Sequence, residues 1–262
     1  MKKISHEIVM LVAVLAWCPV FFEAQPAFSR GDLDLPAQAA PEEYGDVLIS
    51  RRTETSRTVP VIFSHWVHRT GYTCRVCHVE LEFFMVANGT PIVCSGGSMG
   101  GKYCETCHDG TTAFGPSEQG KESCDRCHNA TAKPNRKKFS ALQRKLPSSE
   151  YGNEIDWVKA LKKGAIDPQS SIDGSRQVIR IDKTLRLRAE MSGISESVFP
   201  HGIHEAWLDC SNCHPELFTI KKKSTQNFSM DRIVRGEFCG VCHLKIAFPL
   251  NDCRKCHPAM RR

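Results

Sequence analysis

The chain has 262 residues, with 14 cysteines, 11 histidines and a formal net charge of +6. This net charge is too small to be typical of a nucleic-acid-binding protein. The cysteine content is below that of a small protein held together by disulfides. Leu, Ile, Val and Phe make up only 60 residues, close to the fraction at which side chains stop sufficing for a core. We therefore expect another group to supply part of the interior volume.

Residues 1–27 have the pattern of a secretory signal peptide. Lys2 and Lys3 precede the apolar run Ile8 to Phe22, and Ala24 to Ala27 follow it. The run is shorter than the roughly 20 residues of a membrane span, and Pro19 interrupts it. An uncleaved anchor is the alternative interpretation. The mature protein is expected in the periplasm or another extracytoplasmic space.

The next predicted element is a short strand followed by two histidines. Val59 to Phe63 are rich in β-branched side chains, as strands are. The sequence F-x-H-x-x-H then spans residues 63–68 and contains His65 and His68. Imidazoles three positions apart on a helical turn project from nearly the same face. One short segment can therefore reach two metal centres.

Six copies of C-x-x-C-H follow along the chain. Their cysteines are Cys74, Cys77, Cys104, Cys107, Cys124, Cys127, Cys210, Cys213, Cys239, Cys242, Cys253 and Cys256, and their histidines are His78, His108, His128, His214, His243 and His257. C-x-x-C-H is the attachment sequence of c-type haem: the thiols add to the porphyrin vinyl groups and the histidine becomes the proximal iron ligand. The sequence thus predicts six covalently bound haem c groups.

The cysteines have two alternative interpretations. Six C-x-x-C pairs could form three Cys₄ zinc sites, but that interpretation leaves the six adjoining histidines unexplained. Disulfides are less suited to a vicinal pair repeated six times. Export also favours haem, because c-type haem is attached on the outer side of the membrane.

Residues 131–195 carry no such motif and are predicted to connect two groups of three. Within this connector, Glu154 to Lys163 is predicted as a short amphipathic helix with Asn153 as N-cap and Gly164 as stop. We expect it to pack against a haem edge or the neighbouring unit. Val178 to Ile181 again has the composition of a strand.

The histidine element recurs at residues 199–204, with His201 and His204. In both copies the first histidine lies nine residues before the next motif, and the second lies six residues before it. Apart from His6 in the signal segment, no other histidine lies outside the motifs. The duplicated spacing predicts that all four are distal iron ligands and that the chain is a tandem of two tri-haem units.

Four distal histidines leave two of six irons without a sixth ligand. A methionine thioether is the usual substitute, and it raises the reduction potential. In the second unit Met230 precedes Cys239 by nine residues. In the first unit the candidates are Met99, five residues before Cys104, and Cys94, the one cysteine that lies outside both the motifs and the predicted signal peptide.

An F-x-H-x-x-H element followed by three C-x-x-C-H motifs resembles the tri-haem cytochrome c7 domain, a relative of tetrahaem cytochrome c3. The tandem arrangement is similar to the c7-type "nanowire" cytochromes of metal-reducing bacteria. The resemblance covers residues 44–130 and 196–258, which we predict as the two domains. It implies a multihaem fold of short helices and small N-terminal hairpins, with haem-filled cores.

The resemblance also implies which histidines share an iron. It pairs His65 with His78, His68 with His108, His201 with His214, and His204 with His243. The third haem, at His128 or His257, would take its distal ligand from the segment before the second motif. Met230 follows the methionine seen there in tandem members, whereas the first unit leaves Met99 and Cys94 open.

These features predict an exported electron carrier rather than an enzyme. Expected partners are other redox proteins, namely cytochromes and membrane quinol-linked or outer-membrane electron-transfer complexes, with stacking into larger cytochrome assemblies as a further option. The alternative is a multihaem reductase of an oxyanion or metal, which would need one open iron.

Overall fold

The computed structural model describes residues 34–53, 58–95, 98–118, 121–175, 180–190, 193–221 and 225–260. The predicted signal peptide, residues 1–27, lies outside the described residues. Within the described ranges, no helix is both long enough and apolar enough to cross a membrane.

Each histidine element follows a two-stranded antiparallel hairpin. Strands β1 (Asp46–Ile49) and β2 (Val61–Ser64) pair with Asp46 opposite Ser64. Strands β5 (Thr184–Leu187) and β6 (Ser197–Pro200) pair with Thr184 opposite Pro200. A third, minimal hairpin joins β3 (Ser117–Glu118) and β4 (Lys121–Glu122). The predicted small hairpins are therefore present.

The strand expected at Val178 to Ile181 is wrong in its described part. Residues 180–183 are not in a strand, and residues 178 and 179 lie outside the described residues. The strand is β5, where the sequence Thr-Leu-Arg-Leu alternates exposed and partly buried side chains. This period of two suits a half-buried hairpin strand better than a run of β-branched residues. β5 lies inside the range assigned to the connector.

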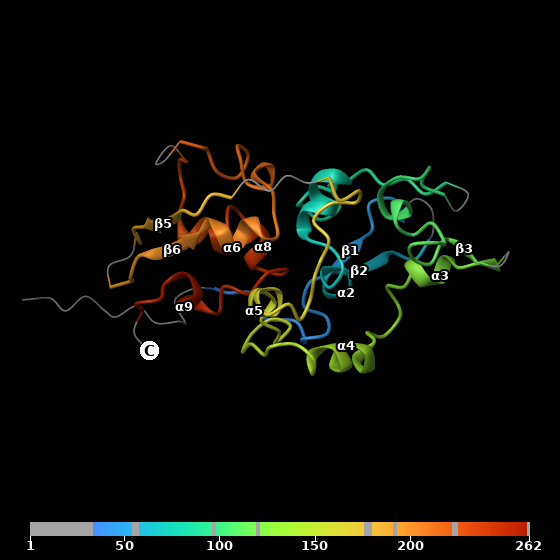
Figure 1. The fold of residues 1–262 in the computed structure, drawn as a ribbon, viewed down its shortest axis with the longest axis horizontal. Helices are drawn as coiled ribbons and strands as arrows, with labels where there is room; N and C mark the ends of the chain where they lie inside the picture. The colour runs from blue at the N-terminus through green and yellow to red at the C-terminus, as the bar shows by residue number, and fades with distance from the viewer. Residues whose placement is uncertain are drawn as a thin grey trace, which may run out of the picture.

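The remaining elements are short helices. Those that carry haem motifs are η2 (Val76–Glu80), η3 (Tyr103–Thr106), α3 (Cys124–Cys127), η4 (Cys210–Asn212), α8 (Gly240–His243) and α9 (Cys253–Cys256). The others are α2 (His65–Arg69), α4 (Arg136–Gln143), α5 (Trp157–Lys162), α6 (His201–Glu205) and α7 (Met230–Val234). Figure 1 shows β5, β6, α6, α8 and α9 on one side and β1, β2, α2 and α3 on the other.

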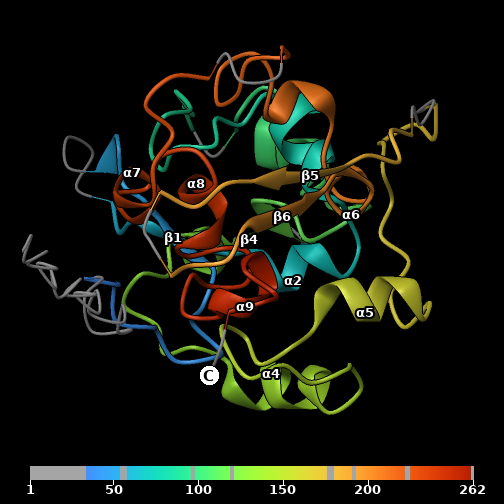
Figure 2. The same ribbon diagram turned by 90° about the vertical axis from the view of Figure 1, so that its left-hand side faces the viewer.

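The connector supplies most of the side-chain core. The buried cluster consists of Trp66, Phe139, Leu146, Ile155, Ala160, Ile166 and Trp207, so the connector packs against one tryptophan from each unit. In Figures 1 and 2, α4 runs along the lower edge of the molecule, and Figure 1 shows α5 near the junction of the two sides. The connector thus fills the junction between the units, as predicted for its helix.

The predicted cap of the connector helix is wrong by three residues. Helix α5 begins at Trp157, and the Asp156 side chain accepts a hydrogen bond from the Lys159 N–H at 2.9 Å. Asn153 is buried, and its side-chain amide instead donates to the main-chain carbonyls of Pro41 and Tyr44. A tertiary contact therefore uses the side chain that the local pattern assigned to capping.

Replacing Asp156 by alanine is expected to lower the free energy of unfolding by about 1 kcal/mol, because one helix N–H loses its acceptor. Guanidinium unfolding followed by far-UV circular dichroism measures this loss. Glu150→Ala, which removes an exposed carboxylate six residues earlier, is the matched control. Equal stability of the two variants would contradict the cap.

Candidate haem sites

One phenylalanine in each histidine element orients both imidazoles. Phe63 meets the His65 ring edge-on, with ring centres 4.8 Å apart, and stacks on the His68 ring at 4.3 Å. Phe199 makes the same two contacts in the second element, at the same two separations. The sequence repeat is thus a repeat of local geometry. The phenylalanine belonged to the repeated pattern, but its orienting role was not predicted.

Three of the four histidine pairs implied by the resemblance face each other. The ring centres are 6.5 Å apart for His65 and His78, 6.2 Å for His68 and His108, and 6.2 Å for His204 and His243. Two imidazoles bound to one metal through bonds of about 2 Å have ring centres about 6 Å apart. These three spacings therefore fit an iron between the rings. For the fourth pair, the described residues show no such ring contact between His201 and His214.

Every histidine in the described part of the chain has the same hydrogen bond. Each Nδ1 lies 2.6–3.1 Å from a main-chain carbonyl oxygen, for all ten of His65, His68, His78, His108, His128, His201, His204, His214, His243 and His257. An Nδ1–H that donates to a carbonyl leaves Nε2 unprotonated and free to bind a metal. The arrangement fits ten iron-binding imidazoles.

These hydrogen bonds also join the last haem motif of each unit to the hairpin at the start of that unit. His128 of the third motif bonds to Val59, just before β2, and His257 of the sixth motif bonds to Ser195, just before β6. His65 bonds in turn to Gly45, beside β1. The last motif of each unit is thereby tied to the hairpin at its beginning.

Burial keeps the ligand groups neutral. It lowers the pKa of His65 to about 3 and that of His243 to about 4, so both rings are unprotonated, as a metal ligand must be. Burial also raises the pKa of the Cys77 and Cys239 thiols to about 12. An uncharged thioether suits such surroundings better than a thiolate does.

All thirteen described cysteines are free of disulfide bonds. In the same part of the chain, no group of three or more His, Cys, Asp or Glu side chains is placed to hold a metal ion.

The candidates for the third ligand lie in different settings. Met99 is partly buried in a loop that Glu105 holds, since the Glu105 carboxylate accepts from the Met99 and Gly101 N–H groups at 2.7 and 2.8 Å. Met230 is the first residue of α7. Cys94 is exposed, and burial raises the pKa of Cys127 in the third motif, with a smaller contribution from Cys94. Ligation by any of the three stays a prediction. The Glu105 anchor was not foreseen.

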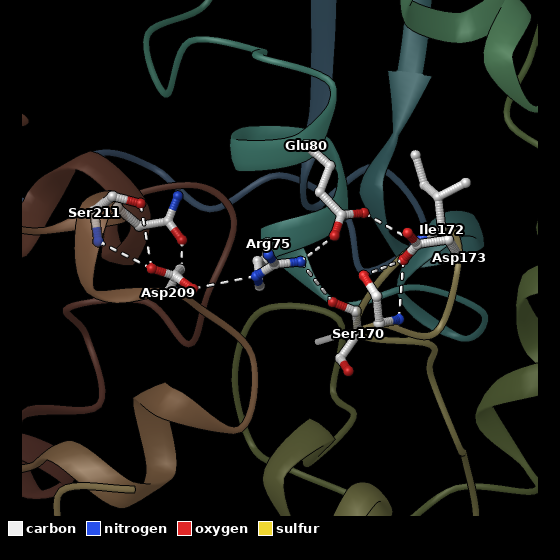
Figure 3. A network of polar contacts seen from close by, with 9 residues as sticks. Arg75, Glu80, Ser170, Ile172, Asp173, Asp209 and Ser211 are labelled. Atoms are coloured by element: carbon white, nitrogen blue, oxygen red, sulfur yellow. Dashed lines mark hydrogen bonds and ion pairs between the residues drawn. The ribbon is translucent and has the colours of Figure 1, made fainter. Parts of the chain in front are cut away.

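A polar network joins the first motif to the fourth (Figure 3). Arg75 forms ion pairs with Glu80 and with Asp209, and it donates to the Ser170 carbonyl at 2.9 Å. Its main-chain N–H also donates to the Trp207 carbonyl. Arg75 therefore ties the connector and the second unit to the first haem motif. Nothing in the sequence pattern marked this arginine.

Comparison with known proteins gives related multihaem proteins. A c7-type three-haem cytochrome domain is 33% identical over 32% of this chain and 100% of its own, with a TM-score of 0.27. The C-terminal hexahaem fragment of GSU1996 is 25% identical over 81% of this chain and 96% of its own, with a TM-score of 0.26. The N-terminal hexahaem fragment is 24% identical over 82% and 99%, with a TM-score of 0.24. No curated protein matches significantly.

The model of one protein family, described as "Cytochrome c7 and related cytochrome c", matches residues 61–129 and 197–258, which is half of the chain. Each matched region contains one pair of histidines and three C-x-x-C-H motifs. The six motifs fit six covalently attached haem c groups. With its two c7-like regions of short helices and small hairpins, the chain belongs to the cytochrome c7 family of multihaem c-type cytochromes.

Proposed function

We propose that this protein is an exported hexahaem c-type cytochrome that relays electrons between redox partners. The observation that carries the proposal is the uniform Nδ1–carbonyl bond, which leaves ten Nε2 atoms free for iron. When bound, each haem iron supplies a one-electron carrier. The chain's own carbonyl groups fix the orientation of the rings.

In this proposal two side chains of the chain would hold each haem iron. The six motif histidines are proximal, and His65, His68, His201 and His204 are distal to the first two haems of each unit. Met230 completes the third haem of the second unit, and Met99 that of the first, with Cys94 as the competing ligand there. Six-coordinate iron exchanges electrons without binding substrate, which favours a relay over a reductase.

Export and partners follow from the same proposal. The segment 1–27 would direct the chain across the membrane, where c-type haem is attached. The donor and acceptor would be other redox proteins, such as cytochromes or membrane quinol-linked and outer-membrane complexes. Because a relay needs contact only at porphyrin edges, further copies could stack into larger assemblies.

Two spectra test the proposal. The dithionite-reduced protein is expected to bind little CO, because no iron has an open position. In the oxidised protein the intensity of a near-infrared sulfur-to-iron band should count the methionine-ligated haems. Met230→Ala should lower this count by one, and the reduced variant should bind one equivalent of CO. Stoichiometric CO binding by the wild-type protein would instead favour a reductase.

Met85→Ala is the control for Met230→Ala. Met85 is also a partly buried methionine, but it lies in the first unit, farther from the next C-x-x-C-H motif than Met230 is from its own. It should leave both the near-infrared band and CO uptake unchanged. Met99→Ala and Cys94→Ala, compared side by side, decide which residue completes the third haem of the first unit.

A further inference from the structure

Glu105 holds the loop that carries Met99. It is the residue after the first cysteine of the second motif, and it lies in η3. Its Oε2 accepts hydrogen bonds from the main-chain N–H groups of Met99 at 2.7 Å and of Gly101 at 2.8 Å. The Ser98 hydroxyl donates to the same carboxylate and lies 3.1 Å from either oxygen. One side chain of a haem motif therefore holds three residues of the loop.

The main chain of this loop has the shape that a single carboxylate needs. Gly100 and Gly101 have φ of +67° and +70°, in the left-handed region where a side chain would be strained. Gly100 lies between the two residues that donate, and its turn directs both N–H groups to one oxygen. A charged acceptor forms stronger hydrogen bonds than a neutral one. The loop thus has both the conformation and the donors to be held by Glu105.

The second unit holds its methionine segment at the same place by a different means. Gly240 follows the first cysteine of the fifth motif, as Glu105 follows that of the second. A Cβ added to Gly240 would overlap the main-chain oxygen of Ile233, in α7. Helix α7, which begins with Met230, therefore packs directly on the fifth motif. In both units, the same position of the middle motif contacts the segment that carries the methionine.

The second motif also lies beside the third motif, whose haem Met99 would serve. Phe114 links the two motifs. Its carbonyl oxygen lies 2.8 Å from Nδ1 of His108, and its ring centre lies 3.6 Å from Cζ of Arg126, inside the third motif. A loop anchored on the second motif is therefore attached to a part of the chain that contacts the third.

We propose that Glu105 is a positioning residue that holds Met99 in place to ligate the third haem of the first unit. The inference rests on the proposed function, in which Met99 is that ligand, and it names the group that fixes it. Residues 81–95 and 98–102, which precede the second motif, form no helix comparable to α7. The Glu105 carboxylate therefore takes the place of the helix packing that holds Met230 in the second unit.

The physical effect of Glu105 is to order the loop before the ligand binds. Fixing the main chain of a loop costs conformational entropy, and an unanchored loop would lose that entropy only when its methionine binds iron. A loop that is already held presents the Met99 thioether without this cost. Without Glu105 the loop regains its freedom, so Met99 ligates the iron for a smaller fraction of the time.

The first test compares Glu105→Ala and Glu105→Gln in the full hexahaem protein. In Glu105→Ala the near-infrared band should lose the intensity of one methionine-ligated haem, and the reduced protein should bind one equivalent of CO. The midpoint of the His128 haem should fall while that of the His257 haem stays in place, as followed by NMR of assigned haem methyl signals in a redox titration. Glu105→Gln removes the charge but keeps an oxygen acceptor, so it should keep the band. Equal loss of the band in both variants would overturn the positioning role, because the charge would then be what matters.

Asp109→Ala is the matched control. Asp109 also flanks the second motif, and its carboxylate accepts from the Thr111 and Thr112 N–H groups at 2.8 and 2.7 Å. It holds a different loop, so the variant should leave the near-infrared band and CO uptake unchanged. Loss of the band in Asp109→Ala would overturn the inference, since any carboxylate beside the motif would then have the same effect.

The second test measures the hydrogen bonds themselves. In the reduced protein, the amides of Met99 and Gly101 should exchange hydrogen roughly fivefold faster in Glu105→Ala than in the wild type, the factor expected for the loss of one hydrogen bond. Exchange at these two amides should stay near the wild-type rate in Asp109→Ala. Unchanged exchange in Glu105→Ala would show that the carboxylate does not hold the loop, and would overturn the proposal.

The outcomes separate the inference from the function on which it rests. Faster amide exchange with an unchanged band in Glu105→Ala would overturn the positioning role and leave the relay intact. If Met99→Ala kept the band while Cys94→Ala opened one iron to CO, Met99 would not be the ligand, and the inference would fail although the relay would stand. If the wild-type haems did not take up and release electrons reversibly, the relay would fail, whereas the positioning role would still be decided by the band and the amide exchange.

Discussion

Replacing His65 by alanine is expected to give a reduced protein that binds one equivalent of CO per chain, where the wild-type protein binds little. The His65 ring lies parallel to that of His78, within 7°, at the separation that two ligands of one iron require. Removing it leaves that iron five-coordinate. A CO titration of the dithionite-reduced Soret band measures the uptake.

His65→Met is the matched variant, because a thioether can replace the imidazole. It should bind little CO and should raise the midpoint of one haem, as exchange of histidine for methionine does. Unchanged CO uptake in His65→Ala, with six haems still present by mass, would show that His65 is not an iron ligand.

Phe139→Ala is expected to lower the free energy of unfolding by about 3–5 kcal/mol, the usual loss for a large buried aromatic side chain. Phe139 is 3% exposed and meets the Trp66 ring edge-on at 5.2 Å. The side-chain core is small and lies between the units, so the cavity has few neighbours that could fill it. Guanidinium unfolding followed by far-UV circular dichroism gives the change.

Ile172→Ala is the control, since this apolar side chain is 44% exposed and lies outside the buried cluster. It should change stability by less than about 1 kcal/mol. Equal losses in the two variants would mean that the connector does not form the structural centre of the molecule.

The local motifs were readable from the sequence because their chemistry is local. The two thiols and the imidazole of a C-x-x-C-H motif reach one porphyrin whatever surrounds them. The three-residue spacing of His65 and His68 likewise determines that both rings leave one face of α2. The hairpins were expected from the family resemblance, but β5 was misplaced, because its pairing with β6 depends on alternation, not on β-branched content.

The N-cap of α5 could not be predicted from the local sequence. Asn153 and Asp156 are both good N-cap residues, and sequence alone does not separate them. The choice was made by Pro41 and Tyr44, more than 100 residues away, whose carbonyls take the Asn153 amide. With its amide nitrogen held there, the Asn153 Oδ1, which is the acceptor that a cap needs, accepts from the indole N–H of Trp157 at 3.3 Å instead.

The sequence by itself determined the six C-x-x-C-H motifs and their two groups of three, each preceded by one F-x-H-x-x-H element, and it predicts that the four histidines of these elements are distal ligands. Only the tertiary structure decided which carbonyl fixes each imidazole and that the connector would become the side-chain core. The physical reason is the separation along the chain over which each interaction acts. Covalent attachment and helical spacing act within about one turn of the chain, whereas burial and hydrogen-bond partnership depend on residues that only folding brings together.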